Sequence, residues 1–396
     1  MTDAELEGRV AVSPGLARLT LALTVFMASG AFPAFALGVL SPLVIDEFRL
    51  SRAALGLITT AMYLVGGLAS VSAGSIVDRA GPRRVIVGAF GLTAVTLACM
   101  ALAPAFPFLV ALAGVAGVAM AAGNPATNKV VASVVPSPYR GTVIGIKQAG
   151  VQLGVFGAGA ALPAIAAGGG WRAAIAASIF VPALGLLVTP RSIDAPPSAG
   201  AGHPNRETSG LSTGLVALTA YAFLMGAGVS ATMAFLPLYL VEARGASLAF
   251  AGLIAAVIGL TAIIFRITWG LWSARLSSYG LALAALAAGS IVSVFVILAI
   301  GSIGIALAVP AALLFGATAS TWNSLGMLAA IDASGSARAG RATGRVLLGF
   351  YFGFVVAPLG FGAIVDSTGT YIPAWLAVAA LFGLATGVAA TVRPGT

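Results

Sequence analysis

Twelve apolar segments of roughly membrane-spanning length constrain this chain more than any other feature of its sequence. A transmembrane helix needs about 20 predominantly apolar residues, and short polar stretches separate the segments from one another. The segments lie near Leu19–Leu43, Ala54–Val77, Val85–Ala103, Phe106–Val131, Thr142–Ala166, Ala173–Val188, Leu215–Leu240, Phe250–Trp272, Leu281–Ile300, Ile305–Ala329, Ala342–Val365 and Ile372–Thr391. The sequence therefore predicts an all-α membrane protein with 12 transmembrane helices.

Composition and charge exclude several other classes of protein. Charged residues make up 8% of the chain, whereas they make up about a quarter of a soluble protein. The net charge of +9 comes from basic residues between the apolar segments, which favours a role in membrane topology over nucleic-acid binding. With a single cysteine, Cys99, and a single histidine, we expect no disulfide within the chain, no metal centre, no cofactor and no enzymatic activity.

A polar stretch divides the twelve segments into two groups of six. Residues 191–213 contain several proline, serine and glycine residues, which is the composition of a flexible linker. We expect an N-terminal six-helix bundle in residues 1–190 and a C-terminal six-helix bundle in residues 214–396, joined by this linker in the cytoplasm.

The two halves also show a weak internal repeat. Three glycines of the first half have counterparts in the second half at a constant offset of 199 residues. The pairs are Gly141 and Gly340, Gly145 and Gly344, and Gly154 and Gly353. Internal repeats of this kind are typical of transporters, whose two halves enclose a central site.

The distribution of lysine and arginine predicts the orientation of the chain. Cytoplasmic loops carry an excess of these residues. If the N-terminus is inside, most basic loop residues fall on the cytoplasmic side, and the outer side keeps only Arg49, Arg52, Arg172 and Arg244. We therefore expect both termini in the cytoplasm and the protein in the plasma membrane.

The loop between the second and third segments, Gly74 to Val85, is the densest charged cluster between two apolar runs. Its sequence Gly-Ser-Ile-Val-Asp-Arg-Ala-Gly-Pro-Arg-Arg-Val predicts a helix end, a turn at Gly81 and a new helix from Pro82. It resembles the signature loop of the major facilitator superfamily, Gly-x-x-x-Asp-Arg-x-Gly-x-Arg-Arg. The motifs at Arg140–Gly141 and Gly170–Trp171–Arg172 support the same resemblance.

This resemblance implies two bundles that rock about a central small-molecule substrate by alternating access. It also implies that the Asp78 carboxylate helps to lock the bundles together when the site faces outward; the alternative is that Asp78 only caps the loop. The candidate gating residues are Gly74, Asp78, Arg79, Gly81, Arg83, Arg84 and, in the second half, Arg275.

Three basic residues lie inside predicted membrane helices, where a charge is costly unless it is used or can reach the surface. Lys147 follows Arg140 by seven residues, about 10 Å along a helix, and is a candidate for substrate binding or gating. Arg266 is another candidate, although it could reach the cytoplasmic interface by snorkelling. Lys129 is nearest to a helix end, and we interpret it as a snorkelling residue.

The sequence Arg-Ile-Thr-Trp-Gly from Arg266 to Gly270 resembles the eighth helix of monocarboxylate transporters and related organic-anion carriers. The resemblance implies that Arg266 engages a carboxylate. The acidic residue that those carriers often place one turn earlier is absent, because that position is Ala262.

Uncharged polar and aromatic side chains complete the set of candidate binding residues. Amides spaced i, i+4 share one helix face, so each such pair could line a cavity or bond to a neighbouring helix. The candidates are Asn124, Asn128, Gln148, Gln152, Tyr221, Trp322, Asn323 and Tyr351.

No aspartate or glutamate lies in the central part of any predicted helix, so the residues favour a carrier of a small organic anion. An exporter of cationic or hydrophobic compounds, which ordinarily needs a buried carboxylate, is the second hypothesis. A membrane sensor that has lost transport is the third. We expect a small-molecule substrate and the lipid bilayer as partners, and a monomer.

Overall fold

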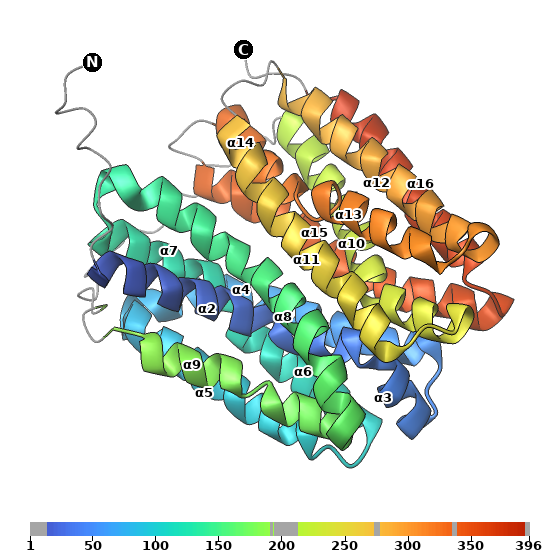
Figure 1. Ribbon diagram of the computed structural model, residues 1–396. Coiled ribbons are helices and arrows are strands. Elements are labelled where there is room, and N and C mark those ends of the chain that lie inside the picture. Colours follow the sequence, from blue (N-terminus) through green and yellow to red (C-terminus); the bar gives the residue numbers. More distant parts are fainter. Residues whose placement is uncertain (1–13, 191–192, 194–212, 273–277, 335–338, 393–396) are drawn as a thin grey trace, which may run out of the picture.

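The computed structural model describes residues 14–190, 193, 213–272, 278–334 and 339–392, and all regular elements in these ranges are helices (Figure 1). The N-terminal half contains α2 (Pro14–Val39), α3 (Ser41–Phe48), α4 (Arg52–Ala80), α5 (Pro82–Ala101), α6 (Phe106–Ala121), α7 (Gly123–Val134), α8 (Ser137–Ala177) and α9 (Phe180–Val188). The C-terminal half contains α10 (Thr213–Arg244), α11 (Leu248–Trp272), α12 (Tyr279–Ile303), the 3-10 helix η3 (Ile305–Leu307), α13 (Ala308–Ala317), α14 (Trp322–Ser334), α15 (Ala339–Thr368) and α16 (Ile372–Ala390). The predicted all-α fold is confirmed.

Eleven helical stretches of the described chain are long and apolar enough to cross a membrane. The longest, Thr142–Val188, has 47 residues and contains two of the predicted segments. Its helix α8 breaks at Gly170, where φ is 73° and ψ is 175°, a conformation that a residue with a side chain rarely adopts. When the two sides of this break are counted separately, the described helices supply the twelve predicted crossings.

The helices form two groups, with α2–α9 at the lower left of Figure 1 and α10–α16 at the upper right. We call the end of the molecule with the loops 49–51, 245–247 and 369–371 the outer end. The end with the turn at Gly81 and the start of α8 is the inner end. These names follow the predicted orientation, which stays a prediction.

The internal repeat is visible in how the two halves pack. A Cβ atom placed on Gly154 of α8 would lie 3.2 Å from the carbonyl oxygen of Ala28 in α2. A Cβ atom on Gly353 of α15 would lie 2.4 Å from the carbonyl oxygen of Phe223 in α10. The pairs α8–α2 and α15–α10 therefore use equivalent glycines to bring two helices together, as small residues do in membranes.

The two bundles contact each other through α4 with α15 and through α8 with α11. Glycines make both contacts close. A Cβ atom on Gly159 of α8 would lie 2.4 Å from the carbonyl oxygen of Gly252 in α11, and one on Gly362 of α15 would lie 2.4 Å from the Arg52 backbone in α4. Both contacts lie in the outer halves of the helices, so the bundles are pressed together at the outer end.

Two predictions fall largely outside the described residues. Of the linker 191–213, only Ile193 and Thr213 are described. Arg275, the second-half counterpart of Arg79, is also outside the described ranges. The boundaries of the two bundles at residues 190 and 214 therefore stay predictions.

Candidate substrate cavity

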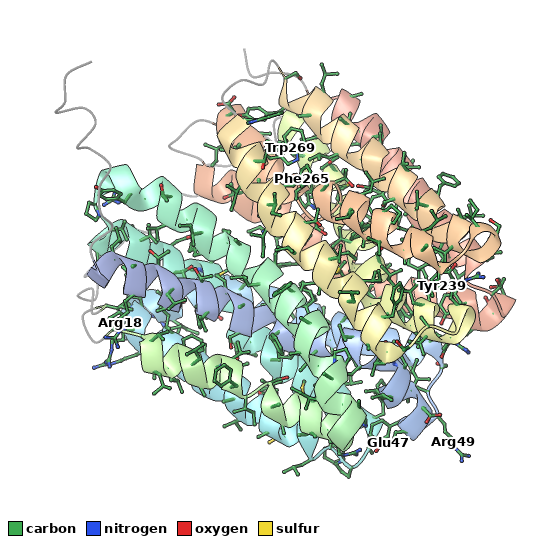
Figure 2. All side chains as sticks on the ribbon, in the orientation of Figure 1. Arg18, Glu47, Arg49, Tyr239, Phe265 and Trp269 are labelled. Carbon is green, nitrogen blue, oxygen red and sulfur yellow. The ribbon has the colours of Figure 1, made fainter. Side chains whose placement is uncertain are left out.

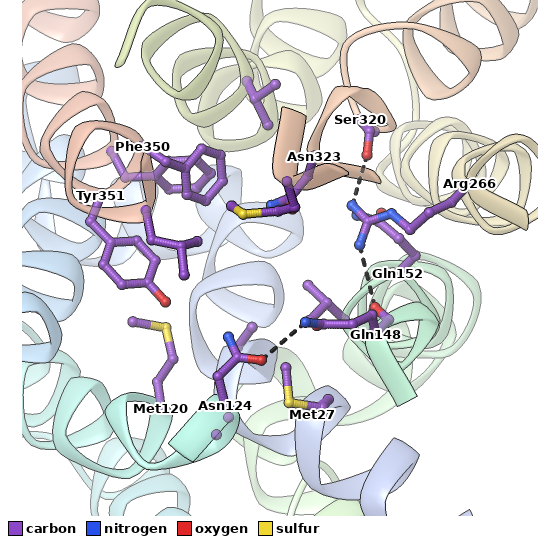
Figure 3. A pocket seen from close by; sticks show the side chains of 18 of the residues that line it. Met27, Met120, Asn124, Gln148, Gln152, Arg266, Ser320, Asn323, Phe350 and Tyr351 are labelled. Atoms are coloured by element: carbon purple, nitrogen blue, oxygen red, sulfur yellow. Dashed lines mark hydrogen bonds between the residues drawn. The ribbon is translucent and has the colours of Figure 1, made fainter. Parts of the chain in front are cut away.

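A cavity of about 390 Å³ lies between the bundles and takes side chains from α2, α4, α6, α7 and α8 on one side and from α10, α11, α14 and α15 on the other (Figure 3). Its lining contains eight of the sequence-predicted substrate residues: Asn124, Asn128, Gln148, Gln152, Arg266, Trp322, Asn323 and Tyr351. The structure thus brings residues from both halves of the chain to one place.

The guanidinium group of Arg266 connects the two bundles at the cavity. Its Nη1 donates to the carbonyl oxygen of Gln148 in α8 at 3.3 Å, and its Nη2 donates to the carbonyl oxygen of Ser320 before α14 at 2.8 Å. Its Nε is buried and has no hydrogen-bond partner. Because Arg266 lines the cavity and no salt bridge among the described residues neutralises it, its guanidinium group offers a ligand a cationic partner.

Two neighbouring residues of α8 fix the amide of Asn124. Gln148 Nε2 donates to Asn124 Oδ1 at 3.0 Å, and Lys147 Nζ lies 3.5 Å from the same oxygen. Because both donors converge on the oxygen, the Asn124 amide nitrogen remains as a donor for another group. Figure 3 shows Asn124 and Gln148 on the floor of the cavity, next to Arg266.

Lys147 is fully buried and does not belong to the cavity lining. Its ammonium group donates to Thr127 Oγ1 at 2.8 Å, behind Asn124. Any effect of Lys147 on a ligand therefore passes through Asn124 or through its charge.

No acidic residue among those that the structure describes lines the cavity. Within the described chain, neither Lys147 nor Arg266 makes an ion pair. Two positive charges therefore lie in a low-dielectric region with only neutral partners, where an anion is attracted far more strongly than in water.

Aromatic rings form the wall opposite Arg266. The Phe350 ring lies at the centre of this group, with ring centroids 5.6 Å from Trp322, 5.9 Å from Tyr351 and 4.6 Å from Phe354. Tyr63 of α4 extends the wall into the other bundle, 4.2 Å from Phe354. We call Tyr63, Trp322, Phe350, Tyr351 and Phe354 the aromatic wall.

Tyr221 lies apart from the cavity. It is buried behind Trp322, with ring centroids 5.6 Å apart, and its hydroxyl group donates to the carbonyl oxygen of Leu283 at 2.8 Å. Its position is that of a packing residue of the C-terminal bundle, and it supports Trp322 from the side away from the cavity.

At the inner end, Lys129 Nζ donates to Asp78 Oδ1 at 2.6 Å. Lys129 thus forms an ion pair with Asp78, where the sequence led us to expect a snorkelling side chain. Both residues belong to the N-terminal bundle, and no salt bridge among the described residues joins the two bundles at this end.

The rest of the signature loop follows the predicted local structure. Gly81 ends α4 with a φ of 84°, and Pro82 begins α5. Arg79 and Arg84 are exposed, whereas the buried Nε of Arg83 has no partner. Nothing lies within 4 Å of a Cβ atom placed on Gly74, so no neighbouring helix fills the space beside it.

At the outer end, polar contacts do join the bundles. The Arg52 guanidinium group donates to Glu242 Oε2 at 3.0 Å. The Asp366 carboxylate accepts from the backbone N–H of Arg52 at 3.0 Å and of Ala53 at 2.8 Å, so it caps α4 from the other bundle. The Tyr371 hydroxyl group donates to Glu242 at 2.7 Å. We call Arg52, Glu242, Asp366 and Tyr371 the outer latch.

A second outer cluster holds the N-terminal bundle together. Glu47 of α3 accepts from Arg172 and from the indole N–H of Trp171, just after the break at Gly170. Figure 2 shows Glu47 beside Arg49 at the outer end. The hydrogen bond from Arg172 holds the pKa of Glu47 below its ordinary value, with a further contribution from Trp171. The motif Gly170–Trp171–Arg172 therefore has a structural role, because its last two residues bond Glu47 within the same bundle.

Sequence reasoning missed the outer latch, the aromatic residues Tyr63, Phe350 and Phe354, and the role of Thr127 as the partner of Lys147. In the sequence, the acidic members of the latch share only the property that they lie outside the central parts of the predicted helices. Their separation in sequence from Arg52 gives no indication of contact, and the phenylalanines are indistinguishable by type from those that face lipid.

Two six-helix bundles around a cavity built by both are the architecture of a multi-pass membrane carrier. The model of the Major Facilitator Superfamily matches residues 19–344. The chain therefore belongs to this superfamily, and the resemblance seen in the signature loop is confirmed. This family points to a transporter rather than an enzyme.

Solved structures of transporters share the fold at low sequence identity. A bacterial homologue of the human lysosomal transporter Spinster, in an inward-facing and occupied conformation, has a TM-score of 0.75 and 16% identity, covering 93% of this chain and 95% of its own. The nucleoside transporter NupG has a TM-score of 0.75 and 15% identity, covering 94% and 99%. A D-xylose–proton symporter has a TM-score of 0.77 and 15% identity, covering 96% and 98%. Among curated proteins, no sequence matches significantly.

Proposed function

We propose that the protein is a secondary transporter that carries a small organic anion, a carboxylate, across the plasma membrane by alternating access and acts as a monomer. The observation that carries this proposal is Arg266, which lines the cavity and bonds only backbone carbonyl groups, while no acidic residue of the described chain lines that cavity. A guanidinium group presents a planar set of donors that matches a carboxylate.

The neighbouring amide side chains also favour an anionic substrate. Asn124 keeps its amide nitrogen free because Gln148 and Lys147 both bond its oxygen. A carboxylate between Arg266 and Asn124 would accept from both side chains. The Lys147 charge, held behind Asn124, would strengthen this donor, because hydrogen bonds in series polarise one another. Asn128, Gln152 and Asn323 would contribute further donors and acceptors along the cavity.

The lining argues against one form of the second hypothesis, the export of cationic compounds. A cationic compound would meet Arg266 in a cavity whose lining offers no carboxylate to balance either charge. Like charges in a low-dielectric site repel strongly. A cation would thus need to enter a site that already has an unbalanced positive charge.

The test compares three ligands of one size and different charge: butyrate, butyramide and butylamine. Binding to purified protein should be measured by calorimetry, and uptake of labelled butyrate should be measured in proteoliposomes. We expect butyrate to bind tightest and to be taken up. Arg266→Gln should weaken butyrate binding by about tenfold to a hundredfold, because a hydrogen bond to a charged group contributes about 1.5–3 kcal/mol.

Two further variants distinguish substrate binding by Arg266 from snorkelling of its side chain. Arg266→Lys should restore only part of the affinity, since lysine lacks the planar fork, whereas a snorkelling arginine would be replaced by lysine with little loss. Arg49→Gln is the matched control, because Arg49 is an exposed arginine at the outer end. Equal binding of butyramide or butylamine overturns the anion proposal, and binding without uptake favours the sensor.

A further inference from the structure

The cavity has two chemically different sides. Arg266, Asn124 and Gln148 form a polar side, and the aromatic wall faces them from α4, α14 and α15. Figure 3 shows Phe350 and Tyr351 across the open space from Arg266, with the Tyr351 hydroxyl group pointing into that space. The polar side can therefore bind a charged group of a ligand, and the aromatic wall can bind an apolar group of the same ligand.

The size of the cavity exceeds the needs of a very small anion. Its volume of about 390 Å³ lies in the range of pockets that enclose drug-sized ligands, about 300–1,000 Å³. A carboxylate of two or three carbons bound at Arg266 would leave the aromatic wall in contact with water. Covering that wall with an apolar group would remove its surface from water and add to the affinity.

The aromatic wall and the methionines beside it are also suited to bind an aromatic ring of a ligand. The ring pairs of Phe350 are tilted by 47° to 52°, and tilted or edge-to-face arrangements are those that aromatic pairs prefer. Four methionines, Met27, Met120, Met233 and Met327, line the rest of the space. Methionine adapts its shape and makes favourable contacts between sulfur and aromatic rings.

We propose that the substrate is an amphipathic carboxylate with an aromatic ring: the carboxylate lies at Arg266 and the ring lies against the aromatic wall. This inference rests on the proposed anion transport and narrows its substrate class. Tyr63 belongs to one bundle and the other four wall residues to the other, so a bound ring contacts both bundles.

The experiment measures binding of acetate, cyclohexylacetate, phenylacetate and phenylacetamide to the purified protein. Phenylacetate should bind at least about tenfold more tightly than acetate, because burying an aromatic side chain contributes about 1.5–3 kcal/mol. Cyclohexylacetate matches the ring in size and apolar character but has no π face, so it should bind more weakly than phenylacetate.

Variants of α15 test whether the ring of phenylacetate binds against Phe350. Phe350→Leu should weaken phenylacetate binding by about twofold to tenfold and weaken acetate binding less, and Phe350→Tyr should retain the phenylacetate affinity. Phe352→Leu is the matched control, because Phe352 lies on the same helix and its side chain is 58% exposed on the outside of the bundle.

The outcomes separate the two proposals. Equal binding of acetate and phenylacetate, or of cyclohexylacetate and phenylacetate, overturns the aromatic substrate and leaves anion transport intact. Loss of phenylacetate affinity in Phe352→Leu as large as that in Phe350→Leu also overturns it. Binding of phenylacetamide as tight as that of phenylacetate overturns the anion proposal itself.

Discussion

The outer and inner ends of the molecule are held together in different ways. At the outer end, Arg52 of one bundle bonds Glu242 of the other, and Asp366 caps α4 across the interface. At the inner end, the ion pair Asp78–Lys129 stays within the N-terminal bundle. The lining of the cavity extends toward the inner end through Ile144 and Ile331, among other residues.

The salt bridges of the described residues join the two bundles at the outer end and not at the inner end. We infer that the outer end is the closed end, because contacts between bundles close the end at which they occur. In the signature loop, the Asp78 carboxylate has its partner, Lys129, in its own bundle. The comparison predicts that changes at the outer end alter the balance between the two states more than changes at the inner end.

The largest effect should come from the glycine contact between α15 and α4. Gly362→Ala would place a Cβ atom 2.4 Å from the Arg52 backbone, and such overpacking costs about 1–3 kcal/mol. The outer end should open. Spin labels on Arg49→Cys and Ala243→Cys, one on each bundle, should show a longer distance.

The matched control for this prediction is Gly360→Ala on the same helix. Nothing lies within 4 Å of a Cβ atom at Gly360, and the gain in helix propensity is the same for both variants. An unchanged label distance in Gly362→Ala, or the same change in Gly360→Ala, would contradict the glycine contact as the element that permits outer closure.

The next effect concerns the cap that Asp366 places on α4. Asp366→Asn keeps the shape but removes the charge from a carboxylate that accepts from Arg52 and Ala53. The Asn side chain has one oxygen and can accept from only one of these two N–H groups. Loss of the other hydrogen bond costs about 0.5–1.5 kcal/mol, so the population with a closed outer end should fall several-fold. The distance between the same two spin labels measures this population.

Glu47→Gln is the comparison variant for Asp366→Asn. Glu47 bonds Arg172 and Trp171 within one bundle, so its loss should lower the stability of that bundle without changing the label distance. If both variants open the outer end equally, the outer latch does not act as a connection between the bundles.

A smaller effect is expected at the inner end. The Asp78 side chain is 44% exposed, and exposed ion pairs contribute about 0.2–1 kcal/mol. Asp78→Asn should lower butyrate uptake because it weakens the outward-facing lock implied by the signature loop. Lys129→Gln breaks the same pair but leaves the Asp78 carboxylate free, so it should reduce uptake less.

If Asp78→Asn and Lys129→Gln reduce uptake equally, the ion pair within the N-terminal bundle explains the effect and no gating role is needed. Unchanged uptake of Asp78→Asn at normal expression would leave Asp78 as a loop residue only.

The smallest effect is the pH dependence that Glu47 adds to stability. Its pKa in the folded protein is held below the ordinary value of 4.5, first by the hydrogen bond from Arg172. A lowered pKa means that the stabilisation is present above pH 4.5 and is lost as the pH falls through the lower folded-state value. The melting temperature of wild type should therefore fall more steeply below pH 4.5 than that of Glu47→Gln. Parallel curves would contradict this contribution.

Much of the fold could be predicted from sequence because membrane helices need long apolar runs and turns need particular residues. The turn at Gly81 and the break at Gly170 follow from glycine's conformational freedom. All four residues of the amide pairs at i, i+4 line the cavity, and Gln148 also bonds Asn124 on the neighbouring helix.

The side of each helix that faces the cavity was harder to predict. Lys147 and Gln148 are neighbours on α8, about 100° apart around the helix, yet only Gln148 lines the cavity. Membrane helices carry little amphipathic pattern, because lipid and protein interior are both apolar. The same reason explains why Tyr221 could not be told from Tyr351 before the structure placed one in the core and the other in the cavity.

The outer latch could not be predicted because its members come from three helices and from the loop before α16. Arg52 and Asp366 are 314 positions apart, and nothing in either local sequence indicates the other. Only the close glycine contacts between α4 and α15 bring the Asp366 carboxylate to the start of α4.

One measurement tests most directly whether an anion site opens to the inside. Met327 lines the cavity, so Met327→Cys in a Cys99→Ser background places a single thiol there. A membrane-impermeant maleimide should label it from the inner face only, and butyrate should slow the labelling whereas butyramide should not. Labelling from the outer face, or equal protection by butyramide, would contradict the account.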